Sequence, residues 1–140
     1  MVVDDHSILR AALVTTIRLS AEYLMGGEAS TATQAFELCR VAPPDIVVMD
    51  SQLPDMSGAE AMGRLRQEFP TIQIIITARY ETASESHAAV KAGARGFVLK
   101  DRLTTELLPA IQAVAAGQFY LPPDMNYPTA PGSDSTSARS

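Results

Sequence analysis

The sequence predicts a single α/β domain in which parallel β-strands alternate with α-helices that cover both faces of the sheet. Two observations support this fold class. The chain has 140 residues, 46% of them hydrophobic and 19% charged, which is typical of one globular domain. Five short apolar runs also alternate strictly with five longer segments of helical periodicity. Such alternation indicates parallel strands joined by crossover helices.

Each expected element rests on a local pattern. The strands are expected at residues 1–3, 23–29, 45–49, 72–77 and 95–99, and the helices at 6–20, 31–41, 57–69, 82–92 and 104–116. Ser57 or Asp55 could cap the third helix, and Gly93 stands where a helix ends in left-handed geometry. Pro109 lies in the second turn of the fifth helix, where it favours a kink over a break.

Composition and charge exclude several classes of protein. Lys and Arg total 11 against 16 Asp and Glu, and the net charge of −5 argues against direct binding of nucleic acid by this chain. No stretch approaches the roughly 20 uncharged apolar residues of a membrane helix. The first residues lack the features of a signal peptide. We therefore expect a cytoplasmic protein that does not associate with a membrane.

The last part of the chain differs in composition from the rest. Residues 122–140 are rich in Pro, Ser, Thr and Gly and show no apolar periodicity. This composition predicts a linker or disordered tail that follows a domain of residues 1–121.

Charged or hydroxyl side chains follow four of the five expected strands. Asp4 and Asp5 follow the first strand and Asp50 the third, Thr77 ends the fourth, and Lys100 follows the fifth. In a doubly wound sheet, ligands bind beyond the carboxyl ends of the strands. Each residue alone has an ordinary explanation, such as a helix cap or a strand end. Chance does not require all of them to meet at one edge, so together they predict a site.

The residue types at this edge indicate phosphoryl chemistry. Crowded carboxylates repel one another unless a cation compensates them, and a hard ion with oxygen ligands, Mg²⁺ above all, suits them better than zinc. Lys100 would supply positive charge and Thr77 a hydroxyl donor for a phosphoryl group. Asp50 would be the nucleophile that forms an acyl phosphate. His6 follows the acid pair but lacks a partner for metal binding.

These motifs resemble the receiver domain of bacterial two-component response regulators. The resemblance rests on "VVDDH" (2–6), "DIVVMDSQLPDMSG" (45–58), "IIITA" (74–78) and "KAGARGFVLKD" (91–101), in family order and spacing. The last motif and "AIQAVAAGQFYLPP" are similar to the LuxR/NarL-type transcriptional subfamily. The resemblance implies a flavodoxin-like (βα)5 fold with a five-stranded parallel sheet of order 2-1-3-4-5.

The resemblance also implies the metal and phosphoacceptor residues. Asp50 matches the aspartate that a partner histidine kinase phosphorylates. Asp5 matches the main acid that binds Mg²⁺ or Mn²⁺, and Asp4 matches its helper, which often acts through water. The backbone carbonyl of Gln52 should complete the protein ligands.

Further residues match the family's switch and rate-tuning positions. Thr77 matches the hydroxyl that moves towards the phosphoryl group, and Lys100 matches the lysine that pairs with it. Phe97 occupies the position of the switch aromatic residue, and because it has no hydroxyl it would act by packing. Gln52 and Arg79, each two positions after a site residue, should overhang the phosphoryl group and tune its hydrolysis.

The resemblance finally implies partners. We expect a cognate sensor histidine kinase, a possible homodimer, and contact with DNA only through an effector domain outside this chain, a helix-turn-helix in this subfamily. The chain would then be the receiver part of a transcription regulator. It would receive a phosphoryl group and could dephosphorylate itself, but it would not be a metabolic enzyme.

Two alternatives remain open at the level of sequence. One is a phosphohydrolase of the haloacid dehalogenase type, which normally needs a second acid where this chain has Gln52. The other is a phosphorylation-independent receiver that serves as a dimerisation or protein-interaction module. The short first run, "MVV", keeps this second alternative open, because a displaced Asp5 would bind a metal poorly.

Overall fold

A computed structural model of the protein describes residues 1–79 and 83–122. The strands are β1 (Val2–Val3), β2 (Glu28–Ala29), β3 (Ile46–Asp50), β4 (Gln73–Ala78) and β5 (Gly96–Leu99). The helices are α1 (Ser7–Leu19), α2 (Ala32–Val41), α3 (Gly58–Glu68), α4 (Ala83–Ala92) and α5 (Leu103–Ala115), with a 3₁₀ turn, η1 (Lys100–Arg102), before α5. The predicted alternation of strands and helices is confirmed.

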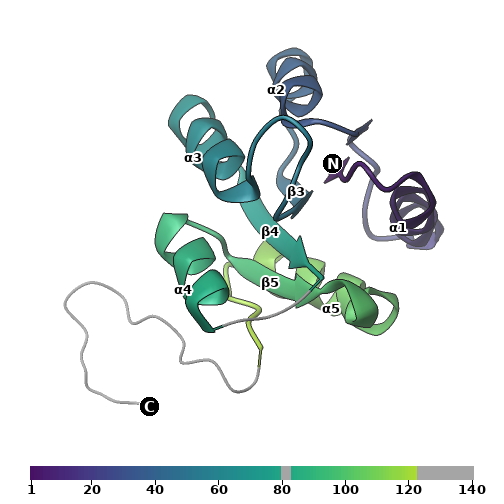
Figure 1. Ribbon diagram of the computed structural model, residues 1–140. Coiled ribbons are helices and arrows are strands. Elements are labelled where there is room, and N and C mark those ends of the chain that lie inside the picture. Colours follow the sequence, from purple (N-terminus) through teal and green to yellow (C-terminus); the bar gives the residue numbers. More distant parts are fainter. Residues whose placement is uncertain (80–82, 123–140) are drawn as a thin grey trace.

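The five strands form one parallel sheet in the order β2-β1-β3-β4-β5 (Figure 1). This is the expected flavodoxin-like order. From β1 the chain builds the sheet first towards β2 and then, through β3, in the opposite direction. The order therefore reverses at β1 and β3, and the carboxyl ends of these two strands flank the place where such sheets bind ligands.

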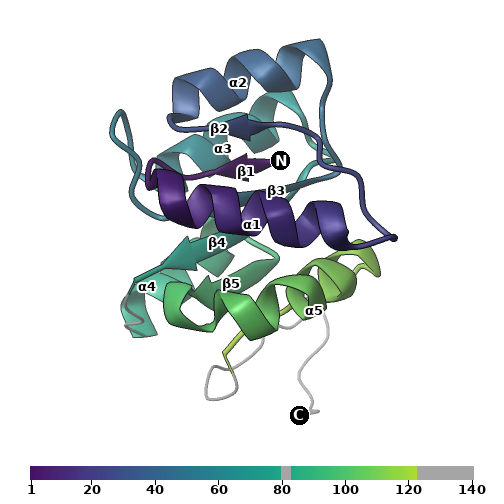
Figure 2. The ribbon, with the colours of Figure 1, turned by 90° about the vertical axis from the view of Figure 1, so that its right-hand side faces the viewer.

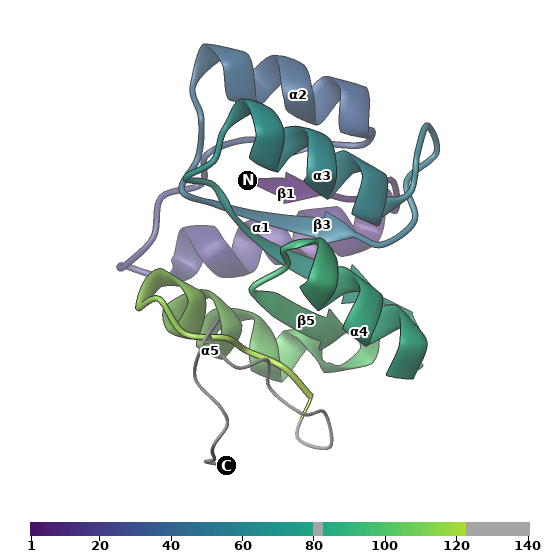
Figure 3. The same ribbon diagram turned by 90° about the vertical axis from the view of Figure 1, so that its left-hand side faces the viewer.

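Helices cover both faces of the sheet. Helices α1 and α5 lie on one face (Figure 2), and α2, α3 and α4 lie on the other (Figure 3). Each helix turns an apolar side towards the sheet, as Leu13, Val14 and Ile17 of α1 illustrate. Alternate residues of one strand face opposite layers, so Met49 packs with α2 and α3 while Val48 packs with α1 and α5. The core therefore consists of two apolar layers separated by the sheet.

The pairing register aligns the ends of the strands. Asp50 at the end of β3 pairs with Thr77 of β4, and Val3 at the end of β1 pairs with Met49. Asp4 and Lys100 directly follow β1 and β5. A shift of one residue in the pairing of any strand would turn that strand's side chains to the opposite face of the sheet, so packing on both faces fixes the register. The packing of the core therefore determines which residues lie at the carboxyl edge of the sheet.

The second strand is shorter than the sequence indicated. A strand was expected over residues 23–29, but β2 comprises only Glu28 and Ala29. Tyr23 and Met25 instead pack against the layer of α1 and α5, and Leu24 is 97% exposed. The apolar run thus marks partial burial of an irregular segment, which strand periodicity cannot distinguish from a short strand.

The other elements agree with expectation to within about one residue at the described ends, the usual uncertainty of element ends. Ser57 caps α3 by accepting a hydrogen bond from the N–H of Glu60, Gly93 has a φ of +118°, and α5 runs unbroken through Pro109. The expected start of the fourth helix, residue 82, lies outside the described residues, as does the tail from residue 123 onwards.

After α5 the chain turns back and lies along β5. Gly117, with a φ of +83°, makes the turn, and Tyr120 then forms a parallel bridge with Gly96. The N–H of Tyr120 donates to the carbonyl of Arg95, and the N–H of Phe97 donates to the carbonyl of Tyr120, both at 2.9 Å. The Arg95 guanidinium stacks over the ring of Phe119 at 4.3 Å. Residues 118–121 therefore cover the outer edge of β5.

Two glycines of α3 allow a matched test of the packing at the carboxyl end of β3. A Cβ atom at Gly58 would lie 2.6 Å from the backbone oxygen of Asp50, whereas a Cβ atom at Gly63 would meet nothing within 4 Å. We expect Gly58→Ala to destabilise the protein by about 1–3 kcal/mol through overpacking. Gly63→Ala should stabilise it by about 0.5–1 kcal/mol through helix propensity.

Urea unfolding of both variants measures these free energies. Equal effects of the two substitutions would contradict the close approach of α3 to the end of β3.

Candidate active site

Asp50 is the central carboxylate at the carboxyl edge of the sheet. It ends β3, is 6% exposed, and accepts two hydrogen bonds. Its Oδ2 atom receives the Lys100 ammonium at 2.9 Å, and its Oδ1 atom receives the backbone N–H of Gln52 at 3.1 Å. Both interactions hold the carboxylate oxygens in place. The side chain is thus fixed at the end of β3, where it lines a pocket.

Lys100 binds two carboxylates. It is the first residue of η1, and its Nζ atom lies 2.9 Å from Asp50 Oδ2 and 3.1 Å from Asp4 Oδ2. Desolvation lowers the pKa of Lys100, but the hydrogen bond to Asp50 and the attraction of the Asp4 carboxylate outweigh it, so its pKa lies above the ordinary value. The ammonium therefore stays charged at every physiological pH.

Asp4 is almost completely buried, with only 1% of its surface exposed. Its Oδ1 atom accepts the backbone N–H of His6 at 2.8 Å, and its carbonyl accepts the Arg10 guanidinium at 2.7 Å. Its Oδ2 atom contacts Lys100, but no hydrogen bond of acceptable geometry reaches this buried oxygen. A buried carboxylate oxygen without a hydrogen bond is costly, so this atom can accept a further donor, such as a metal-bound water.

The three acids at this edge could hold a metal ion. Carboxylate oxygens of Asp4, Asp5 and Asp50 all lie within 4.8 Å of one another. Asp5 is exposed, so it faces solvent beside the buried pair. Oxygen donors with one position open to water suit Mg²⁺ or another hard divalent ion. The short β1 therefore does not displace Asp5 from the other two acids.

A pocket of about 530 Å³ opens over these acids. It is lined by Asp5, His6, Asp50, Ser51, Gln52, Ala78, Arg79 and Lys100. Both predicted rate-tuning residues, Gln52 and Arg79, thus border the space above Asp50. Thr77 is 1% exposed, and it is not among the described residues that line this pocket.

Phe97 lines a second cavity, which adjoins the first. This cavity of about 260 Å³ lies between α3, α4 and the sheet and shares Ser51, Gln52 and Ala78 with the active-site pocket. The Phe97 side chain is 2% exposed. An aromatic residue beside such a cavity has room to change its packing without opening the core.

Three residues around the site have roles that the sequence did not indicate. His6 is the N-cap of α1, and its Nδ1 atom accepts the N–H of Leu9 at 3.1 Å. Arg10 of the same helix holds the Asp4 carbonyl. Asp55 does not cap α3; it binds the start of α2 instead. The position of His6 just before a helix could have predicted its cap, whereas the other two contacts are long-range.

Comparison with known proteins identifies a family. The family model for the response regulator receiver domain matches residues 1–112 of this chain. The nitrate/nitrite response regulator NarL of Escherichia coli K12 is 31% identical over 121 residues, which cover 86% of this chain and 56% of NarL. The DNA-binding transcriptional activator DevR/DosR of Mycobacterium tuberculosis H37Rv is 34% identical over 119 residues, which cover 85% and 55%. The chain thus spans about half the length of these relatives.

Solved structures agree with this comparison. A LuxR-family two-component response regulator from Aurantimonas sp. SI85-9A1 superposes with a TM-score of 0.84 and 38% identity, over 89% of each chain. The signal receiver domain of NarL from Mycobacterium tuberculosis gives a TM-score of 0.79 and 30% identity, over 84% of this chain and 94% of that one. The chain therefore belongs to the response regulator receiver domain family, and its relatives are regulators of the NarL/LuxR type.

Proposed function

We propose that Asp50 is the phosphoacceptor of this receiver domain and that a histidine kinase is its phosphoryl donor. One observation carries the proposal: a half-buried lysine bridges Asp50 and Asp4 at the wall of an open pocket. The Asp50 carboxylate would attack the phosphorus of a phosphohistidine, and the bond from phosphorus to the donor nitrogen would break. Lys100 would stabilise the charge on the transferred oxygens.

The acids around Asp50 fit a Mg²⁺ or Mn²⁺ cofactor. Asp5, Asp50 and the carbonyl of Gln52 would be its protein ligands, and Asp4 would act through a bound water. Bound there, the ion would neutralise phosphoryl oxygens during transfer. The oxygen-only donor set and the buried Asp4 oxygen without a hydrogen bond support this assignment.

Thr77 and Phe97 would transmit phosphorylation to the surface. Thr77 pairs with Asp50 across the sheet, and its hydroxyl, which lies outside the pocket lining, would move towards a phosphoryl oxygen. Phe97 would then repack within the cavity that it shares with Gln52. This movement would change the surface formed by α4, β5 and α5, and with it dimerisation or the release of an effector domain.

The whole protein would be a transcription regulator of the cytoplasm. DevR/DosR is described as a DNA-binding transcriptional activator. By analogy, DNA would be bound through an effector domain outside this chain, and a homodimer is compatible with this role. In the described residues, no helix combines the length and hydrophobicity needed to cross a membrane.

The two alternatives fit the site less well. A phosphohydrolase of the haloacid dehalogenase type would need an acid at Gln52. A phosphorylation-independent receiver would not need the complete set of Asp4, Asp5, Asp50 and Lys100, which the fold brings together. Receiver domains are signalling proteins, and any hydrolysis here would be release of the domain's own phosphoryl group.

The first test replaces the phosphoacceptor. We expect Asp50→Asn to abolish labelling by radioactive acetyl phosphate in the presence of Mg²⁺, because an amide cannot form the acyl phosphate. Asp45→Asn is the control, since Asp45 is an exposed acid directly before the same strand. Undiminished labelling of Asp50→Asn would refute the assignment.

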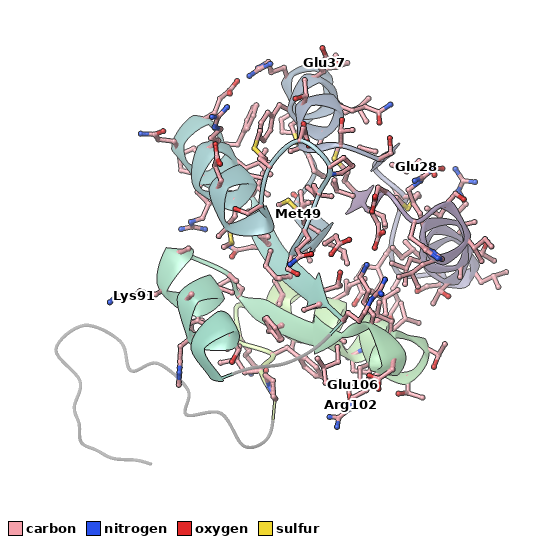
Figure 4. All side chains as sticks on the ribbon, in the orientation of Figure 1. Glu28, Glu37, Met49, Lys91, Arg102 and Glu106 are labelled. Atoms are coloured by element: carbon pink, nitrogen blue, oxygen red, sulfur yellow. The ribbon has the colours of Figure 1, made fainter. Side chains whose placement is uncertain are left out.

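The second test concerns hydrolysis of the acyl phosphate. Gln52→Ala and Arg79→Ala should each raise the rate of dephosphorylation by about threefold to tenfold, because removal of a side chain over the pocket admits water. The rate is measured by loss of label after the donor is removed. Arg102→Ala is the control, because Arg102 projects outwards beside α5 (Figure 4). Unchanged rates in both pocket variants would exclude the proposed shielding.

A further inference from the structure

The loop between β3 and α3 is tied to the first turn of α2 (Figure 1). Asp55 of this loop accepts the N–H of Ala32 at 3.0 Å through Oδ1. Its Oδ2 atom accepts the N–H of Thr33 at 2.9 Å and the Thr33 hydroxyl at 2.7 Å. These three bonds join positions that are 22 and 23 residues apart in the sequence.

Helix α2 already has a local cap. The hydroxyl of Thr31 accepts the N–H of Gln34 at 3.0 Å. Asp55 takes the two remaining donors at the very start of the helix, where an anion is also favoured by the helix dipole. Desolvation raises the pKa of Asp55, but the hydrogen bonds from Thr33 and Ala32 outweigh it and lower the pKa to about 2. The carboxylate is therefore charged, and the attachment intact, at neutral pH.

The loop is also rigid between Asp55 and the active site. The N–H of Leu53 donates to the carbonyl of Met56 at 3.1 Å, and Gln52 forms an antiparallel bridge with Ser57. The N–H of Gly58 donates to the carbonyl of Ser51 at 2.8 Å. The loop is thus a small hydrogen-bonded hairpin, and its inner end carries Gln52.

Gln52 connects this hairpin to the phosphoacceptor. Its N–H donates to Asp50 Oδ1 at 3.1 Å, and its side chain borders the active-site pocket. A hairpin that is fixed at both ends has little freedom to tilt. If the outer attachment were lost, the hairpin could pivot about Asp50 and carry the Gln52 carbonyl out of position.

We propose that Asp55 is a positioning residue for the active site, which holds the Gln52 carbonyl in place by attaching its loop to the start of α2. The inference rests on the proposed function, in which that carbonyl binds Mg²⁺. It adds α2, a helix that contributes no side chain to the pocket lining, to the elements on which metal binding depends.

The experiment compares four proteins: wild type, Asp55→Ala, Thr33→Val and Glu37→Gln. Thr33→Val removes one of the three bonds and keeps the side-chain shape. Glu37→Gln is the control, because it removes one negative charge, as Asp55→Ala does. Glu37 lies on α2, to which Asp55 binds, and points away from the protein (Figure 4).

Two measurements separate loop position from helix stability. Amide hydrogen exchange of the metal-free proteins gives the exchange rates of the Leu53 and Gly58 N–H groups, which are hydrogen-bonded within the hairpin. Calorimetric titration reports Mg²⁺ affinity. In Asp55→Ala we expect faster exchange of both groups and Mg²⁺ affinity lower by about tenfold, the lower end of what loss of a supporting contact costs a metal site. Thr33→Val should show smaller changes in the same direction, and Glu37→Gln none.

Other outcomes overturn the inference. If Asp55 only caps α2, exchange quickens in the first turn of α2 while Leu53, Gly58 and Mg²⁺ affinity stay as in wild type. Unchanged Mg²⁺ affinity in Asp55→Ala, beside normal binding by wild type, refutes the inference and leaves the proposed function standing. A wild-type protein that binds no Mg²⁺ refutes both.

Discussion

The ion pairs of Lys100 with Asp4 and Asp50 are the interaction on which the rest of the site depends. They join the carboxyl ends of β1, β3 and β5 at one buried point. Without the ammonium, two buried carboxylates would repel each other at short range in a poorly solvated site. The lysine thus offsets this repulsion. A single ammonium among three carboxylates still leaves negative charge, which is why the site suits a divalent cation.

The sheet could be predicted from the sequence because its three longest strands are continuous apolar runs. Residues such as Ile74, Ile75 and Ile76 are buried, and a short run of consecutive apolar residues is typical of a parallel strand that is covered on both faces. The edge was predictable for the same reason, since a polar residue that ends a buried strand must lie at its rim. Asp4, Asp5, Asp50 and Lys100 lie together at this edge, whereas Thr77 lies outside the pocket lining.

What could not be predicted depends on contacts between distant segments. The apolar run at 23–29 gives no indication that Tyr23 and Met25 pack as an irregular segment. Asp55 lies close to two helix starts in space but to only one in sequence, so local rules offered it, beside Ser57, as a cap of α3 and gave no sign of its bonds to α2. The burial of a segment can be predicted from its composition, whereas the partner of an individual hydrogen bond cannot.

The pairing of Tyr120 with β5 has a consequence for solubility. A parallel sheet of five strands has two edges, and an uncovered edge invites pairing with another molecule and aggregation. On one side the outer strand, β2, has only two residues. On the other side, residues 118–121 occupy the backbone groups of Arg95 and Phe97. Residues 118–121 therefore leave fewer free backbone groups on β5 for pairing with another molecule.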